Sequence, residues 1–294
     1  MRPAACLLPF SPRVGPHPHA LSLAGAATRR FPPAAPSGRR RFSFFLLPFS
    51  FYLIPIASCG SPSAPSAAAL GSALPVETAT AHYVFHSVQT DAVQPDTQEV
   101  YHAWLIGQLG VPVDRAINYY KYRDRAHMNQ VTGKVTNGWA DPAGYALHSI
   151  WPWDNHEVVH VVSALIGRPT DFFNEGIAVA MQMDPQHDVW EPMWNSRSIH
   201  GWASDYHRNR EMPALVDMIE TDDFRRLDDT KSYPMAGSFV RFMIDDRGME
   251  RMKAFFRAGS RDASRADIDR QFNVAFGITL QDAEKRWFSF LDAR

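Results

Sequence analysis

The sequence predicts an α+β fold, in which a small mixed β-sheet comes first, carries one functional helix, and is followed by a mostly helical C-terminal part. One observation favours this fold, and a second bears on its size and stability. Alternating segments rich in β-branched and aromatic residues all precede residue 151, whereas capped segments with helical periodicity dominate after it. Beyond residue 58 the chain contains one cysteine, Cys59, so a hydrophobic core without disulfides must stabilise a single domain of ordinary size.

The first half of this domain is expected to alternate strands with short helices. Residues 82–88 alternate in polarity and are rich in β-forming side chains, and two later segments share this character. A helical segment follows the first strand, with Asp96 as its N-cap and Gly110 at its end. In order, we expect a strand at 82–88, a helix at 96–109, a strand at 116–122, a short helix at 123–131 and a strand at 145–150.

Helices are expected to dominate the remainder. Asp154 or Asn155 caps an apolar helix that ends at Gly167, and a second helix follows from about 170 to 183. Pro234 suits the first position of a later helix, because the first turn does not need its missing N–H. The later helices are expected at 234–246, 249–257 and 280–291.

The first two of these helices carry the chemistry. His156 and His160 are spaced i,i+4, so they lie on one helix face and can point at one metal ion. Glu157 projects beside them, where it can take a proton from water that the metal activates. Glu175, from the second helix, supplies a third ligand, and the small Gly176 beside it would let the two helices approach closely. Three protein ligands with one open position are typical of catalytic zinc, whereas structural zinc sites are usually closed by four protein ligands.

Two simpler interpretations stay open at this point. The two histidines could belong to an ordinary buried helix and bond to carbonyl groups. Alternatively, the site could bind a metal ion without catalysing a reaction. The combination of two histidines at i,i+4, a glutamate between them and a second glutamate-bearing helix favours the catalytic interpretation over both.

The HExxH segment, a short turn, and then Asn174-Glu175-Gly176-Ile177-Ala178 resemble the gluzincin metallopeptidases. The stretch at 233–242, with its Tyr-x-x-x-Gly-Ser-Phe-Val pattern, and the ending at 275–280 are similar to these proteins more loosely, so the resemblance covers roughly residues 80–294. It implies a zincin-like fold, one Zn²⁺ held by His156, His160 and Glu175, and Glu157 as the general base. It also implies that the strand at 145–150 forms the sheet edge that pairs with an extended substrate, although an ordinary half-buried strand would fit the sequence equally well.

One departure from the family pattern affects the residues around the ligands. Thermolysin-type members carry an aspartate four residues after the glutamate ligand, where it orients a histidine, and Val179 stands at that position here. Asn174 is therefore our candidate for the residue that orients one histidine. Tyr233 is our candidate for stabilising the oxyanion, although a buried structural tyrosine would fit the pattern equally well, and His200 or His207 are further candidates for that role.

The N-terminal region differs from the rest of the chain. Residues 1–58 contain seven arginines and no acidic residue. Three of these arginines, at 39–41, precede an apolar stretch at 42–58, and Ile56-Ala57-Ser58-Cys59 then resembles a bacterial lipobox. We expect residues 1–58 to be a leader, Cys59 to be lipidated, residues 59–78 to be a flexible tether and residues 79–294 to be the metallopeptidase domain.

Other interpretations of this leader are possible. It could be an uncleaved membrane anchor, which its 17 apolar-region residues with two prolines disfavour, or an organelle transit peptide. The unusually long stretch before the arginines suggests a translation start downstream, at a position such as Val14 or Leu21. The lipoprotein interpretation places the domain in the bacterial cell envelope, facing the periplasm or the exterior.

The charge of the domain bears on its partners. Residues 59–294 carry 23 Lys+Arg against 31 Asp+Glu, and this acidic balance gives no indication of nucleic-acid binding. We expect the partners to be a peptide or protein substrate and the membrane, through the lipid at Cys59. The expected function is zinc-dependent hydrolysis of peptide bonds. The alternatives are a non-catalytic zinc-binding surface lipoprotein and an amidase that acts on a non-peptide or cell-wall substrate.

Overall fold

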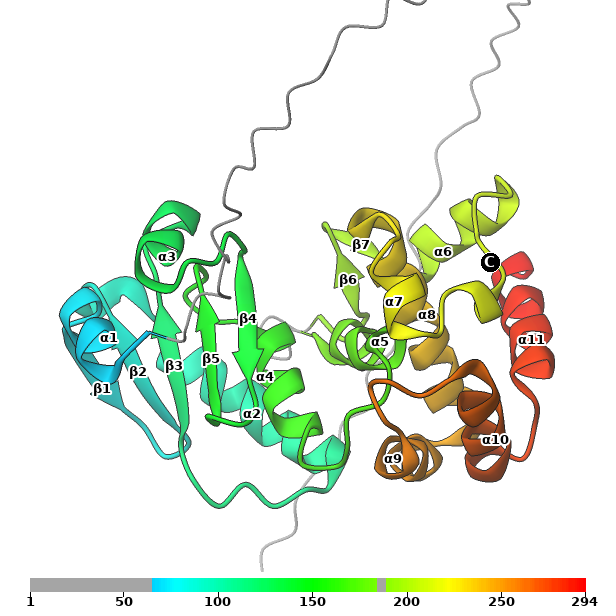
Figure 1. The fold of residues 1–294 in the computed structure, drawn as a ribbon, viewed down its shortest axis with the longest axis horizontal. Helices are drawn as coiled ribbons and strands as arrows, with labels where there is room; N and C mark the ends of the chain where they lie inside the picture. The colour runs from blue at the N-terminus through cyan, green and yellow to red at the C-terminus, as the bar shows by residue number, and fades with distance from the viewer. Residues whose placement is uncertain (1–64, 184–188) are drawn as a thin grey trace, which may run out of the picture. The chain divides into compact units, whose positions relative to one another are not determined.

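A five-stranded mixed sheet forms the N-terminal half of the computed structural model, and helices form most of the rest (Figure 1). The structure describes residues 65–183 and 189–294, all within one of the two units into which the chain divides, Ser58–Arg294. The predicted leader and Cys59 lie outside the described residues. The predicted α+β fold is therefore confirmed for the described chain.

The sheet combines three parallel inner strands with antiparallel edge strands. The parallel strands are β2 (Tyr83–Ser87), β3 (Ile117–Lys121) and β5 (Ala146–Ser149), and each coincides with a predicted strand. β1 (Val76–Ala79) pairs antiparallel with β2, and β4 (Gly138–Asp141) pairs antiparallel with β5. The order across the sheet is β1-β2-β3-β5-β4.

The expected edge strand was placed wrongly. Residues 146–149 lie inside the sheet, between β3 and β4, and the edge belongs to β4, which the sequence did not predict. A tight turn joins β4 to β5, in which Gly144 N donates to Asp141 Oδ1 at 3.1 Å and Tyr145 N donates to Pro142 O at 3.3 Å. The Asp-Pro-Ala-Gly turn was thus a local signal for a hairpin, and β4 was missed because three of its four residues, Gly138, Ala140 and Asp141, are weak strand formers.

The segment predicted to be a tether is partly ordered. Helix α1 (Ala67–Ala73) begins at Ser66, whose side chain accepts a hydrogen bond from Ala69 N. Leu74 then packs in a small apolar cluster with Tyr122 and Met128. The prediction of a flexible stretch to residue 78 is wrong from about residue 66, because an alanine-rich run is a good helix former and Leu74 anchors it.

Two helices adjoin the sheet before the chain reaches the candidate site. Helix α2 (Pro95–Leu109) begins one residue before the predicted cap, with Gln94 as its N-cap, and ends at Gly110 in the left-handed conformation that glycine favours. Helix α3 (Arg125–Thr132) is capped by Asp124, which accepts from His127 N at 2.8 Å. Helix α4 (Asn155–Ser163) follows β5 directly, lies against β4 and β5, and packs on α2.

The helical half begins with α5 and continues to the C-terminus. Its elements are α5 (Asp171–Met181), the short strands β6 (Met193–Trp194) and β7 (Arg197–Ser198), α6 (Ile199–Arg208), α7 (Thr221–Phe224), α8 (Asp229–Arg247), α9 (Met249–Ala258), α10 (Arg265–Phe276) and α11 (Leu280–Asp292). Within the described residues, no helix has both the length and the apolar content needed to cross a bilayer.

Helix α8 begins five residues earlier than predicted, so Pro234 lies inside it rather than at its first position. A proline at this point leaves the carbonyl of Thr230 without its helical donor. Tyr206 Oη, from α6, donates to that carbonyl at 3.5 Å. The cost of an interior proline is thereby reduced by a tertiary contact that the sequence does not reveal.

Helices α5 and α8 pack against each other at unusually close range. A Cβ added to Gly176 would lie 2.6 Å from Val240 Cγ2, and one added to Gly237 would lie 2.4 Å from Val179 Cγ1. Gly176 therefore faces α8, and our expectation that it would bring the two metal-site helices together was wrong. Its role is to let α5 pack closely on α8, which fixes the position of the adjacent Glu175.

Candidate metal centre and active site

The start of α4 is anchored at the end of the sheet. Asp154 caps the helix by accepting from Glu157 N at 3.1 Å, and its other carboxylate oxygen accepts from Ser149 Oγ at 2.7 Å. Asp154 N donates to Gln98 Oε1, at 3.0 Å, on α2. These bonds fix the first turn of α4, and with it the direction of His156.

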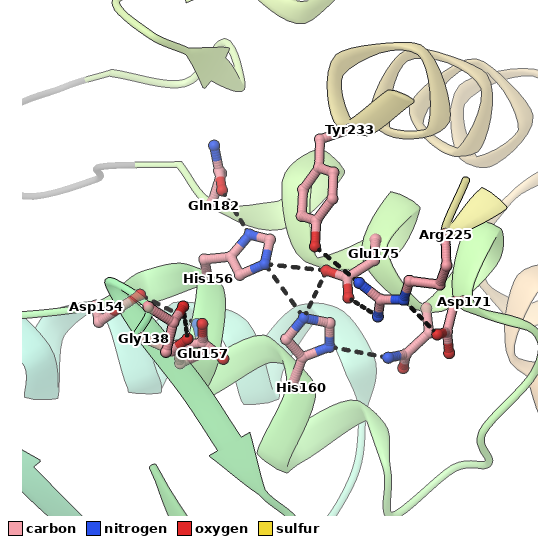
Figure 2. Close-up of polar contacts among 12 residues, drawn as sticks. Gly138, Asp154, His156, Glu157, His160, Asp171, Glu175, Gln182, Arg225 and Tyr233 are labelled. Atoms are coloured by element: carbon pink, nitrogen blue, oxygen red, sulfur yellow. Dashed lines mark hydrogen bonds and ion pairs between the residues drawn. The ribbon is translucent and has the colours of Figure 1, made fainter. Parts of the chain in front are cut away.

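His156, His160 and Glu175 converge on one point (Figure 2). Glu175 Oε2 lies 3.3 Å from His156 Nε2 and 3.1 Å from His160 Nε2, and the two Nε2 atoms lie 3.2 Å apart. Three ligands about 2.0–2.1 Å from a tetrahedral ion are separated by about 3.3 Å, so this triangle has the size that zinc requires. Within the described residues, no other group of three or more His, Cys, Asp or Glu side chains is arranged to hold a metal ion.

Both histidines are held by a second residue through Nδ1, which leaves Nε2 to face the candidate metal position. Gln182 Nε2 donates to Met193 O at 2.5 Å, so Gln182 Oε1 is directed to His156 Nδ1, 2.9 Å away. The Asn174 amide lies 3.2 Å from His160 Nδ1. Turned about its terminal bond, this amide offers Oδ1 as an acceptor for the Nδ1–H of His160. Asn174 thus lies where the sequence placed it, whereas Gln182 was not predicted.

Arg225 engages the oxygen of Glu175 that does not face the histidines. Its guanidinium donates to Glu175 Oε1 at 2.8 Å, to Asp171 Oδ2 at 2.6 Å and to the hydroxyl of Tyr233 at 3.2 Å. Arg261 donates twice more to Asp171, at 2.9 and 3.0 Å. With Oε1 occupied in this way, Glu175 presents a single oxygen, Oε2, to the metal position.

Tyr233 lies beside the ligands, as the sequence predicted (Figure 2). Its ring is 6.1 Å from the ring of His156 and 5.1 Å from that of Trp194. Burial and the negative charge of Glu175 raise the pKa of the phenol, so it remains protonated at neutral pH. Because Arg225 donates to its oxygen, the phenolic hydrogen is free to donate elsewhere.

Glu157 is buried between the start of α4 and the edge strand. A Cβ added to Gly138 of β4 would lie 2.9 Å from both Glu157 Oε1 and Asp154 Oδ2, so only glycine leaves room for the carboxylate there. Burial, and then the neighbouring charge of Asp154, raises the pKa of Glu157 to about 7. A carboxylate with a pKa near neutrality is suited to accept and return a proton.

The candidate ligand residues balance one another's charge. Burial opposes a charge on His156, but its hydrogen bond to Glu175 and the surrounding carboxylates outweigh that effect and raise its pKa to about 9. Burial likewise opposes the charge of Glu175, but the charges and hydrogen bonds of His160 and His156 hold its pKa well below the usual value. The donor set of two imidazoles and one carboxylate is one that suits zinc.

An open cleft of about 920 Å³ leads to the ligands, and β4 forms part of its wall. Asn137 faces β5 with its backbone groups, because Ile150 N donates to Asn137 O. Along an antiparallel strand, residues alternate between those whose backbone groups bond to the partner strand and those whose groups point away from it. The N–H and C=O groups of Gly138 and Ala140 therefore point away from β5. The carbonyl oxygen of Gly138 already accepts a hydrogen bond from the hydroxyl of Thr136, at 2.9 Å. Among the described residues, no strand covers this side of β4.

Two histidines that we considered as oxyanion donors lie elsewhere. His200 is buried, with Nδ1 2.9 Å from Ser238 Oγ, and burial lowers its pKa to about 4. His207 lies 3.2 Å from Asp292 on α11. Neither lines the cleft. Both belong to α6, which packs on α8 and α11 away from the ligands, so these two predictions are wrong.

The sequence of α5 contained a signal for some of the residues around the candidate ligands that the sequence analysis did not predict. This helix is almost entirely apolar, yet Asp171, Asn174, Glu175 and Gln182 lie at spacings that place them on one face. All four contact the ligands or Arg225. No comparable local pattern marks Arg225, which arrives from the end of a four-residue helix.

Comparison with known proteins gives no further guide to this site. A scan against protein-family models and a search of curated proteins both found no match to the chain.

Proposed function

We propose that this protein is a zinc-dependent peptidase with a zincin-like fold. The observation that supports this most directly is the triangle of His156 Nε2, His160 Nε2 and Glu175 Oε2, with sides of 3.1–3.3 Å, beside the carboxylate of Glu157. A zinc ion held by these atoms would act as a Lewis acid and bring the pKa of a water molecule toward neutrality.

In this proposal Glu157 moves the proton. Its raised pKa and its place next to the edge strand suit it to accept a proton from the attacking water and then deliver it to the leaving amine. Asp154 holds the backbone of Glu157, and Gly138 leaves the space in which its carboxylate lies.

The edge strand β4 would hold an extended substrate. The outward N–H and C=O groups of Ala140, and the N–H of Gly138, are the groups that pair with an added strand. Pairing at Gly138 would bring the substrate backbone near Glu157, because a Cβ added to that glycine would lie 2.9 Å from the carboxylate. The geometry therefore suits a peptide, whose backbone repeats the complementary groups.

Tyr233 and Arg225 would stabilise the oxyanion that forms on the attacked carbonyl. The phenol has a free hydrogen and lies beside His156, and Arg225 adds positive charge behind it. Removing one such donor in other enzymes costs roughly 100- to 1000-fold in turnover, so a loss of about that size in Tyr233→Phe is expected.

The cellular location remains part of the proposal. The arginines at 39–41, the apolar stretch and Cys59 support a lipoprotein of the bacterial cell envelope, with an organelle-targeted protein as the alternative. Mass spectrometry of the mature N-terminus would decide between them, since a diacylglyceryl group on Cys59 is expected only for the lipoprotein.

Metal content and peptide cleavage test the catalytic proposal together. The mature chain and its Glu157→Gln variant would be compared with a broad peptide library and with purified cell wall. One zinc ion in both proteins, with peptide cleavage by the unmutated protein alone, is expected. Zinc in both without cleavage by either would point to a binding role, and release of cell-wall fragments without peptide cleavage would point to a non-peptide amidase.

A further inference from the structure

The cleft contains arginines that its own carboxylates do not neutralise. Four arginines line it, and two of these, Arg225 and Arg261, are committed to Asp171 and Glu175. Arg125 and Arg168 form no ion pair with any carboxylate among the residues that the structure describes. A cation left without an acidic partner in a substrate cleft is available to a negatively charged group of a ligand.

Arg125 differs from Arg168 because it is held in place next to the edge strand. Its Nε donates to Asn137 Oδ1 at 2.6 Å, and Asn137 directly precedes Gly138. That single bond orients the guanidinium and leaves both terminal nitrogens unbonded among the described residues. A guanidinium presented in this way can form the two parallel hydrogen bonds that carboxylates accept.

We propose that Arg125 recognises a carboxylate of the substrate, one or two residues from the bond that is cleaved. This inference rests on the proposed peptidase function. The short distance follows from the register of β4, because a Cβ added to Gly138 would lie 2.9 Å from the Glu157 carboxylate, and Asn137 is the immediate neighbour of Gly138. An extended substrate advances about 3.3 Å per residue, so a group paired beside Asn137 lies one or two residues from the reacting carbonyl.

Two kinds of peptide carry such a carboxylate, and they share the same chemistry. One bears an aspartate or glutamate side chain near the cleaved bond. The other ends in a free α-carboxylate at that place, which would make the enzyme remove short C-terminal fragments. Matched peptides distinguish them, since exchanging Glu for Gln removes the first carboxylate and amidating the C-terminus removes the second.

The test compares these matched peptides on the mature protein and on three variants. Arg125 is exposed, so within the matched pair that carries the recognised group we expect the peptide with the carboxylate to have a kcat/KM about threefold higher, the size typical of an ion pair with an exposed arginine. Arg125→Gln should abolish the preference, and Arg125→Lys should keep part of it. Arg123→Gln is the matched control, because Arg123 is an exposed neighbour outside the cleft, and it should leave the preference unchanged.

Binding separates this inference from the peptidase proposal. The Glu157→Gln protein, which should bind without cleaving, would be titrated with fluorescent forms of the same peptides at low and high salt. The carboxylate preference should appear in the dissociation constants and shrink with salt. Equal affinity and equal cleavage of the acidic and neutral peptides, or a preference that survives in Arg125→Gln, would overturn the inference while leaving peptidase activity established. Preferential binding without cleavage of any peptide would support the role of Arg125 and count against the peptidase.

Discussion

Replacement of Arg225 by methionine should weaken the proposed zinc binding without removing any of the three proposed zinc ligands. Methionine is about as long as the arginine stem but has no N–H groups. The change removes the 2.8 Å hydrogen bond to Glu175 Oε1 and the 3.2 Å bond to Tyr233. Asp171 keeps both bonds from Arg261, so the variant does not leave that carboxylate alone.

The expected size follows from the exposure of the two partners. A hydrogen bond to a charged group contributes about 1.5–3 kcal/mol. Glu175 is buried, but the Arg225 side chain is 43% exposed, so solvent screening favours the lower part of that range. About 1.5–2 kcal/mol corresponds to a zinc dissociation constant roughly 10- to 30-fold higher, within the range for residues that orient metal ligands.

Competition with a chromophoric zinc chelator measures this constant directly and does not depend on catalysis. Arg226→Met is the matched control, because Arg226 is the adjacent arginine, is 72% exposed and pairs only with Asp223 among the described residues. Its zinc affinity should equal that of the unmutated protein. A constant within twofold of the unmutated value for Arg225→Met, or an equal weakening in both variants, would refute the reasoning.

Three further predictions concern packing, the general base and pH. Gly237→Ala should lower the free energy of unfolding by about 1–3 kcal/mol in urea denaturation, because its Cβ would lie 2.4 Å from Val179, whereas Gly107→Ala, with open space around it, should raise it by about 0.5–1 kcal/mol. Gly138→Ala should lower kcat about 10- to 100-fold with zinc content unchanged, since the new methyl displaces Glu157; an unaltered kcat contradicts this. Burial lowers the pKa of His200 to about 4, so below about pH 6.5 the unfolded chain takes up a proton at this residue and the folded chain does not. The free energy of unfolding should therefore fall as the pH falls from about 6.5 to 4. His200→Gln should reduce this dependence on pH by about 1.4 kcal/mol per pH unit.

Local spacing determined much of the site. The i,i+4 separation brings His156 and His160 to one side of α4 because helix geometry alone dictates it. The same argument applies to the polar face of α5, which carries Asn174 and Glu175. Strands β2, β3 and β5 were likewise predictable, since their alternation of side chains is a property of the strand itself.

Only the tertiary structure decided which residues surround the histidines and Glu175. Arg225 reaches Glu175 across 50 positions through packing that no sequence period encodes, and the helical spacing that puts Gln182 on the polar face of α5 does not reveal its contact with His156, 26 positions away. Residues 145–150 were expected at the edge of the sheet, but a short hairpin adds β4 beside them, so β4 is the edge strand. Pairing between two strands is not visible in the sequence of either strand alone. Contacts within one or two helical turns follow from backbone geometry, whereas contacts between distant segments depend on how whole elements pack, and here that packing placed His200 against Ser238 and Gly138 against Glu157.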